Sequence, residues 1–225
     1  MYKCCIFDLD GTLVNSIYAI QTAANRTLES LGLGRISEEE TKRYVGDGYK
    51  KLMERALKAC GDEKLNHYEE ALLRYSEFFK ECCMYRVEPY EGIREMLAFL
   101  KDGGLRIAVL SNKPHGRAVE NVEGIFGKGY FDLVSGERES EGIRRKPAPD
   151  GVWLCAKELG ADLRECLYLG DTNTDMKTGL AAGVDTAGVT WGFRGRAELE
   201  EFSPAYLVDR PSQVIGIVKE VNGIA

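Results

Sequence analysis

The chain has 225 residues, of which 44% are hydrophobic and 29% charged, as in an ordinary folded globular protein. A formal net charge of −6 argues against a nucleic-acid partner, and no apolar run approaches the roughly 20 residues that span a bilayer. No signal peptide precedes the first predicted strand, and the seven cysteines include no Cys-x-x-Cys pair or other metal-binding spacing. We therefore expect a cytoplasmic protein with reduced thiols and without a membrane partner.

The first predicted element is a short buried strand at residues 4–7, where four apolar residues follow one another. From residue 16 to residue 86 the pattern is helical, and no strand is convincing there. We expect this stretch to be an all-helical insert, with residues 1–15 and 87–225 forming the main domain. The predicted helices of the insert are 16–31, one opening at 37, 50–59 and 66–83.

Helix-start signals and apolar stripes support these helices. Asn15 and Ser16 are candidate caps for the first helix, and Ser37 with Glu40 has the spacing of a capping box. One apolar stripe of the last helix predicts a buried face. Its members are Leu72, Leu73 and Phe79.

From Pro89 onward, predicted strands and helices alternate. Repeated β–α units imply a parallel sheet with helices on both faces, so the predicted fold is α/β with a Rossmann-like core and an inserted helical domain. The predicted strands are 105–110, 131–134, 166–169, 185–189 and 206–208. The predicted helices are one ending at about 102, then 116–126, 150–159, 174–182 and 212–221.

Asp8 and Asp10 follow the first strand and lie two residues apart. The end of a parallel strand is where α/β folds place their ligands, and alternate residues of an extended chain share a face. Two carboxylates this close repel each other and normally need a cation. The pair therefore predicts a Mg²⁺ site that leaves one carboxylate free to react.

Other polar residues are predicted at the same sheet edge. Ser111 and Asp171 each follow a strand, and Lys146 lies in a loop. These residue types divide the work of phosphoryl transfer. One aspartate can attack phosphorus, and a second can move protons. Asp171 can complete an oxygen shell for Mg²⁺, while Ser111 and Lys146 can bind the phosphoryl oxygens.

These residues resemble the four motifs of the haloacid dehalogenase superfamily of phosphatases. The motifs, in chain order, are Asp8-Leu9-Asp10-Gly11-Thr12, then Ser111, then Lys146 before Pro147, and lastly Gly170-Asp171-Thr172-Asn173-Thr174-Asp175. The resemblance covers nearly the full length. It implies that the helical insert is the small cap that closes over the site and selects the substrate.

The resemblance also implies a role for each motif residue. Asp8 would be the nucleophile and Asp10 the general acid/base, a group that dehalogenases lack because a halide needs no proton. Asp8, Asp171 and the main-chain carbonyl of Asp10 would hold Mg²⁺. Lys146 would orient the nucleophile and stabilise the transferring group.

Ser111 and the Asn112 backbone would bind phosphate under the same resemblance. Thr12 and Asp175 would lie one layer further out and orient their neighbours. Lys113 is interpreted either as a substrate-facing cation or as a surface lysine. Solvated charges are expected at Lys50, Lys51 and Arg194.

Three segments, 45–51, 111–114 and 190–194, resemble the phosphoglycolate phosphatase branch, although Asn15 stands where that branch usually carries Asp. The predicted activity is Mg²⁺-dependent hydrolysis of a small phosphorylated metabolite, with 2-phosphoglycolate favoured. Nucleotidase, pyrophosphatase and β-phosphoglucomutase-like phosphotransferase activities stay open, as does a non-catalytic binding role. A monomer and a homodimer are both compatible with the sequence.

Overall fold

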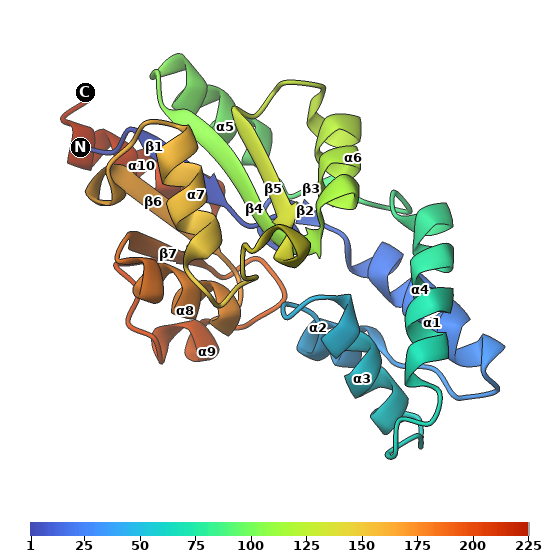
Figure 1. Cartoon of the computed structure of the whole chain (residues 1–225). Helices are drawn as coiled ribbons and strands as arrows, with labels where there is room; N and C mark the ends of the chain where they lie inside the picture. Colours follow the sequence, from blue (N-terminus) through green and yellow to red (C-terminus); the bar gives the residue numbers. More distant parts are fainter. Residues whose placement is uncertain (225) are drawn as a thin grey trace. The chain divides into compact units, whose positions relative to one another are not determined.

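The chain forms two compact units in the computed structural model, which describes residues 1–224 (Figure 1). The larger unit combines Met1–Val14 with the chain from Pro89 onward, and the smaller unit is Asn15–Glu88. The chain passes between them in two short strands, β2 (Val14–Asn15) and β3 (Glu88–Pro89), which pair with each other. Within the larger unit, the amide of Tyr90 donates a hydrogen bond of 3.2 Å to the carbonyl of Leu13.

The larger unit is built on a six-stranded sheet in the order β5-β4-β1-β6-β7-β8. Every neighbouring pair is parallel, which confirms the predicted fold class. Phe7, the last residue of β1, is level with Val109 on β4 and Leu169 on β6, so β1 lies in register between its two neighbours. The strands are β1 (Cys4–Phe7), β4 (Arg106–Pro114), β5 (Leu133–Glu137), β6 (Cys166–Gly170), β7 (Asp185–Val189) and β8 (Tyr206–Val208).

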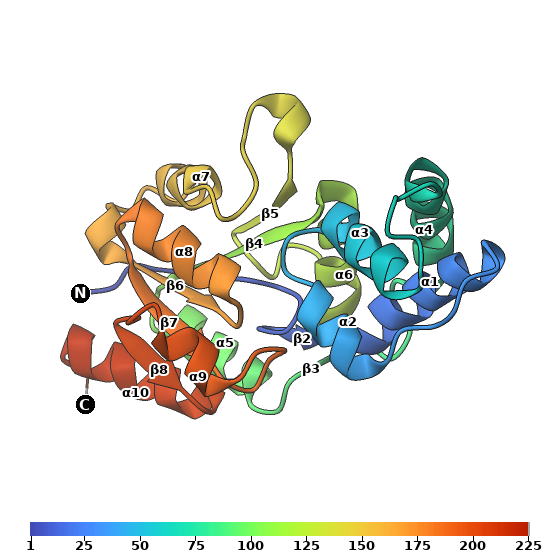
Figure 2. The same cartoon turned by 90° about the horizontal axis from the view of Figure 1, so that it is seen from below.

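Helices cover both faces of this sheet, as Figure 2 shows: α7 and α8 lie on one face, and α5 and α10 on the other. The main helices are α5 (Ile93–Asp102), α6 (His115–Phe126), α7 (Asp150–Glu158), α8 (Asn173–Ala182) and α10 (Pro211–Asn222). The shorter α9 (Arg196–Glu200) was not predicted.

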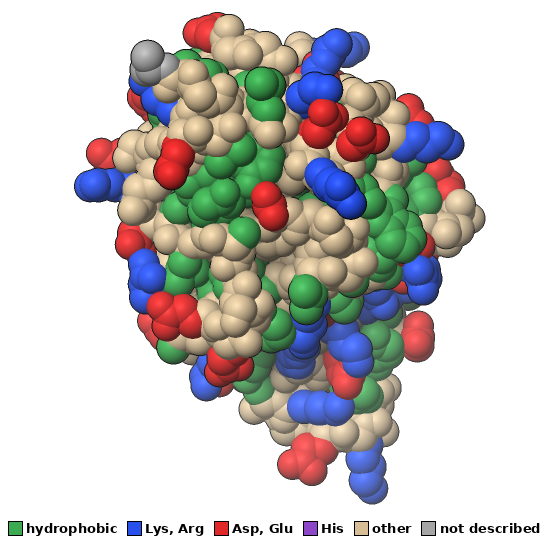
Figure 3. Space-filling model, turned by 90° about the vertical axis from the view of Figure 1, so that its left-hand side faces the viewer, with side chains coloured by type: hydrophobic (Ala, Val, Ile, Leu, Met, Phe, Trp, Pro, Cys, Tyr) green, Lys and Arg blue, Asp and Glu red, His purple; other side chains and the backbone are tan. Residues whose placement is uncertain are grey.

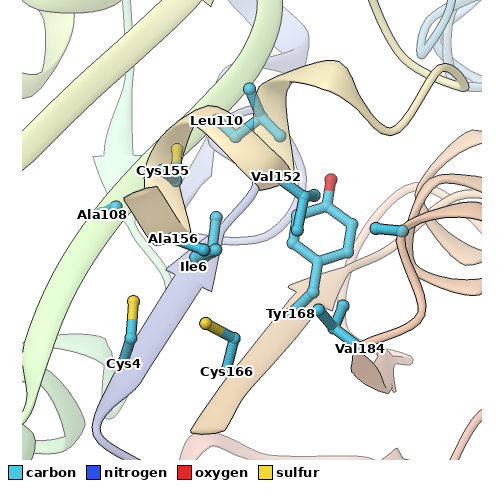
Figure 4. Packing of buried hydrophobic residues seen from close by; sticks show 11 residues of the cluster. Cys4, Ile6, Ala108, Leu110, Val152, Cys155, Ala156, Cys166, Tyr168 and Val184 are labelled. Carbon is cyan, nitrogen blue, oxygen red and sulfur yellow. The ribbon is translucent and has the colours of Figure 1, made fainter. Parts of the chain in front are cut away.

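One hydrophobic cluster joins the sheet to α7 (Figure 4). It contains Ile6 from β1, Val152 from α7 and Tyr168 from β6, and the thiols of Cys4 and Cys166 meet across neighbouring strands in register. The hydroxyl of Tyr168 points away from those thiols. All seven cysteines are free.

Strand β4 is longer than the sequence suggested. The predicted strand stopped at residue 110 because polar residues follow it, but the structure continues it through Ser111 to Pro114, with an irregularity in register after Leu110. Pro114 still pairs with Glu137 of β5. The polar residues after Leu110 therefore belong to strand β4 itself and lie at the carboxyl end of the sheet.

The smaller unit is helical. The predicted capping box is confirmed: the Glu40 amide donates to Ser37 Oγ at 3.2 Å, and the Ser37 amide donates to the Glu40 carboxylate at 2.7 Å. Helix α1 packs on α4 and α2, and α3 packs on α4 and α2. The helices are α1 (Ile17–Ser30), α2 (Glu38–Tyr44), α3 (Tyr49–Ala59) and α4 (Tyr68–Cys82).

One local prediction in this unit was wrong, and another was confirmed for only one of its two residues. Leu73 is 70% exposed, because the side of α4 that packs inward carries a different set at three- and four-residue spacing, namely Ala71, Tyr75, Phe79 and Cys82. At the start of α1, Ser16 makes no side-chain cap bond. The cap bond comes instead from the Ile17 amide, which donates to Asn15 Oδ1 at 3.3 Å.

Candidate active site

The carboxylate of Asp8 lies where β1 ends. The backbone amide of Asp8 continues the sheet by donating a hydrogen bond to the Leu169 carbonyl at 2.8 Å, and the side chain of Asp8 is buried. The turn that follows needs glycine at position 11, whose φ is +98°. A Cβ there would also lie 2.3 Å from Asp171 Oδ2, so the bare backbone lets Asp171 approach this turn closely.

Lys146 is the central cation of the site. Its Nζ donates to Asp8 Oδ1 and to Asp175 Oδ1, each at 2.7 Å, and its side chain is only 4% exposed. Burial lowers the pKa of this ammonium, but the carboxylates of Asp175 and Asp8 outweigh that effect and raise it. The lysine is therefore held charged between two buried carboxylates.

The backbone of Lys146 is fixed by the side-chain amide of Asn112. Asn112 Oδ1 accepts from the Lys146 amide at 2.9 Å, and Asn112 Nδ2 donates to the Lys146 carbonyl at 3.0 Å. The sequence prediction gave Asn112 only a backbone role in phosphate binding. No local signal could have shown this contact, because the two residues are 34 positions apart.

Asp175 is anchored by donors from the chain around it. Tyr168 donates its hydroxyl proton to Asp175 Oδ1 at 2.7 Å, and Thr172 donates its hydroxyl to Oδ2 at 2.6 Å. Burial raises the pKa of this carboxyl, but Lys146 and these hydrogen bonds outweigh burial and lower it. Asp175 is thus a fixed carboxylate. The sequence did not reveal the contribution of Tyr168, which has the pattern of an ordinary strand residue there.

Asp171 is held from two sides. Thr12 Oγ1 donates to Asp171 Oδ1 at 3.0 Å, and the Phe193 amide donates to Oδ2 at 2.8 Å. The Thr12 carbonyl accepts in turn from Trp191 Nε1 at 2.9 Å. Burial, followed by the charge of Asp175, raises the pKa of Asp171 to about 7.

Three buried carboxylates meet here. Asp8, Asp171 and Asp175 each offer an oxygen within 4.8 Å of the others. Burial raises the pKa of Asp8 well above its usual range even though Lys146 opposes that shift. Three acids beside one ammonium leave excess negative charge, and an all-oxygen donor set of this kind suits a hard divalent cation. The arrangement fits a metal site.

The remaining predicted residues lie beside this cluster. Ser111 is buried, and its Oγ accepts from the Lys113 amide at 3.2 Å. Lys113 is buried as well, so its interpretation as a surface lysine was wrong. Its Nζ donates to Asp10 Oδ1 at 2.7 Å. Asp8 and Asp10 therefore pair with different lysines, Asp8 with Lys146 and Asp10 with Lys113.

Among the charges expected to be solvated, Lys50 and Lys51 are exposed. The expectation for Arg194 was wrong: its side chain is 10% exposed and pairs with Glu198 at 3.2 Å. On the face shown in Figure 3, acidic and basic side chains are interspersed with hydrophobic ones. Within residues 1–224 no helix is both long enough and apolar enough to cross a bilayer.

Residues 5–189 match the family model of haloacid dehalogenase-like hydrolases, and the chain belongs to this family. It is a phosphatase of this class, and it carries three buried aspartates that could hold a metal ion beside the ammonium of Lys146.

Known relatives are similar over almost the whole chain. A phosphoglycolate phosphatase of Aquifex aeolicus (strain VF5) is 32% identical over 95% of both chains. Another from Neisseria meningitidis (serogroup A) is 30% identical over 96% of this chain and 90% of its own. A solved structure of a candidate phosphoglycolate phosphatase from Lactobacillus delbrueckii subsp. bulgaricus has a TM-score of 0.85 at 29% identity, covering 95% of this chain and 96% of that one.

Proposed function

We propose that this phosphatase hydrolyses 2-phosphoglycolate through an aspartyl-phosphate intermediate on Asp8, with Mg²⁺ as its metal. The observation that carries the proposal is the buried arrangement of Asp8, Lys146 and Asp171, in which Lys146 Nζ lies 2.7 Å from Asp8 Oδ1. The relatives named phosphoglycolate phosphatase support the choice of substrate. A cytoplasmic location is part of the proposal and is supported by the seven free thiols.

The first step uses the carboxylate of Asp8 as the nucleophile. An Asp8 oxygen forms a bond to phosphorus while the ester P–O bond breaks. Lys146 fixes the rotation of the Asp8 carboxylate, and Asp175 and Asn112 fix Lys146. Asp8, Asp171 and the main-chain carbonyl of Asp10 would hold Mg²⁺, which would supply positive charge that offsets the negative charge of this site.

Asp10 moves the protons in both steps. It gives a proton to the leaving alcohol oxygen and then takes one from the water that attacks the phosphoryl group on Asp8. That attack breaks the bond between phosphorus and the Asp8 oxygen and releases phosphate. Ser111 and the backbone of Asn112, at the end of β4, are our proposed donors to the phosphoryl oxygens.

The helical unit is our proposed cap. It is inserted directly after the motif that contains Asp8 and Asp10, at the chain crossings in β2 and β3. A cap of this kind would exclude water from the reaction and select among small esters. Monomer and homodimer both stay compatible with this proposal.

The test is a panel of phosphate esters at fixed Mg²⁺, in which kcat/KM is measured for sugar phosphates, nucleotides, pyrophosphate and 2-phosphoglycolate. We expect 2-phosphoglycolate to rank first. A nucleotide or pyrophosphate in first place would contradict the substrate. Conversion of a sugar phosphate to its isomer without release of phosphate would indicate a phosphotransferase. Absence of Mg²⁺-dependent turnover across the panel would contradict the proposed chemistry altogether.

A further inference from the structure

Lys113 has no role in the chemistry proposed so far, yet its side chain is buried beside the residues to which we assign that chemistry. Its side chain is 6% exposed, and its ammonium lies 2.7 Å from the carboxylate of Asp10, whose side chain is 17% exposed. A buried ion pair gains little stability over an apolar pair, because both charges lose water. The pair is therefore a poor device for holding the fold together and points to a ligand.

Lys113 contacts the residues that we propose to bind the two ends of the ester, the phosphoryl group and the leaving oxygen. Its backbone amide donates to Ser111 Oγ at 3.2 Å, which ties it to the proposed phosphate-binding residue. Its ammonium contacts Asp10, the proposed proton donor to the leaving oxygen. Lys146 is already engaged by Asp8 and Asp175. Lys113 is thus the cation of the site that lies next to the leaving group rather than the nucleophile.

The chemistry of the leaving group then decides what Lys113 recognises. An ammonium has three N–H donors, so it can hold Asp10 and an anionic group of the substrate together. When a carboxylate is attached to the carbon that carries the ester oxygen, the two groups lie within roughly 3 Å, one hydrogen-bond length, of each other. A leaving oxygen bound to Asp10 therefore places such a carboxylate within reach of Lys113.

We propose that Lys113 determines specificity by binding a carboxylate on the carbon next to the ester oxygen, and so selects phosphorylated 2-hydroxy acids. This inference rests on the proposed function and deepens it, because 2-phosphoglycolate is the smallest member of that class. Esters with a neutral or cationic group at this position leave the ammonium without its substrate partner.

The experiment compares two esters that differ only at this group. In 2-hydroxyethyl phosphate, a hydroxymethyl group replaces the carboxylate of 2-phosphoglycolate. The wild-type protein should favour the carboxylate ester in kcat/KM by at least about tenfold, the scale of one charge-assisted hydrogen bond. In Lys113→Met that ratio should fall about 10- to 100-fold, mainly because KM for the carboxylate ester rises.

The ratio separates recognition from any effect on Asp10. Disturbing Asp10 slows both esters equally and leaves the ratio unchanged, so an unchanged ratio in Lys113→Met overturns the inference. The matched control is Lys128→Met, which removes an exposed lysine of the same unit and should keep the wild-type ratio. Lys113→Gln is the second variant if Lys113→Met does not fold.

The wild-type measurement also distinguishes this inference from the proposed function. Equal kcat/KM for the two esters overturns the role of Lys113 while leaving a phosphatase in place. Phosphate release from other esters but from neither of these two overturns both the proposed substrate and the role of Lys113.

Discussion

The two units of the molecule place their charges differently. The larger unit buries three aspartate–lysine pairs at one sheet edge, two made by Lys146 and one by Lys113, and the side chains of these lysines are 4% and 6% exposed. In the smaller unit, the ion pairs made by lysine and arginine lie near the surface, as in Arg74–Glu70, where the side chains are 34% and 53% exposed. Buried charges cost free energy that a fold does not need to spend. The burial of these lysine–aspartate pairs in one unit therefore supports our proposal that the chemistry takes place at its sheet edge.

The largest effect should come from removing Asp8, the proposed nucleophile, in the larger unit. Asp8→Asn keeps the volume but loses the charge that attacks phosphorus, so we expect turnover to fall by more than about 10³-fold. The measurement is phosphate release under saturating substrate, with circular dichroism to check the fold. The control is Asp102→Asn, an exposed aspartate of the same unit. Turnover within tenfold of wild type would exclude a covalent intermediate on Asp8.

Removing the central cation should cost somewhat less. In Lys146→Met, Asp8 and Asp175 lose the ammonium between them, and we expect kcat to fall about 10²- to 10³-fold, as for loss of one preorganised donor. Steady-state kinetics on the best ester checks this. Lys157→Met, on the exposed side of α7, should behave as wild type. A similar rate in Lys146→Met and Lys157→Met would contradict the role of the buried pair.

The buried acids should also make the metal-free larger unit sensitive to pH. The pKa of Asp171 is about 7 in the fold against 3.8 for the free group. Because the pKa is raised, the folded protein binds the Asp171 proton more tightly than the unfolded chain does. The resulting contribution to the free energy of unfolding is fully present below about pH 4 and is lost as the pH rises through 7. In EDTA we expect Asp171 to contribute a loss of about 2 kcal/mol between pH 5 and 8.

Thermal unfolding across this pH range measures the effect, and Asp171→Asn should flatten the slope. Mg²⁺ should raise Tm of the wild type at pH 8 and have a much smaller effect on Asp171→Asn. A wild-type Tm that is unchanged by Mg²⁺ would argue against a metal at this cluster.

Removing the side-chain amide of Asn112 should have a smaller effect, which is divided between stability and turnover. Asn112→Ala leaves the amide and carbonyl of Lys146 without their side-chain partner, which should cost about 1–2 kcal/mol of stability. Because Lys146 then loses its fixed position, kcat should fall more than KM rises. Urea unfolding and steady-state kinetics on the same preparation test the two parts. A stability loss with unchanged kcat would show that Lys146 is positioned by its ion pairs alone.

The smallest effect should come from the smaller unit. Glu70→Gln removes the exposed pair with Arg74 at four-residue spacing on α4, and such pairs contribute about 0.3–0.5 kcal/mol. Urea unfolding at low and high salt should show a difference near the limit of detection and weaker in salt. A loss above about 2 kcal/mol, well beyond an exposed pair, would mean that the two units do not differ as described.

Much of the larger unit could be predicted because its strands are short apolar runs that end in polar residues. The run before Asp8 and the run before Asp171 both predicted strand ends at one edge, and the parallel sheet brings those ends together. In the smaller unit, Leu73 was misplaced because adjacent leucines fit more than one helical phase. The burial of Ala71 and Tyr75 shows which phase the packing selects.

The network around Lys146 could not be predicted in the same way. Its contact with Asn112 depends on how a loop folds back across the sheet, and neither residue type signals such a contact. Lys113 was ambiguous for a related reason. Polar residues after an apolar run resemble a solvated loop, whereas β4 continues through them and keeps the lysine buried.

The hydrogen bond between Leu13 and Tyr90 has a consequence for how the helical unit could be exchanged. Leu13 and Tyr90 flank the helical unit in the sequence, and their hydrogen bond lies within the larger unit. The helical unit is therefore an inserted loop whose two ends are held next to each other. The entropy of closing a loop grows only slowly with its length. If the helical unit is the proposed cap, exchange of residues 15–88 as one piece would change the part of substrate selection that this unit carries and would leave Lys113 and the other residues of the sheet edge in place.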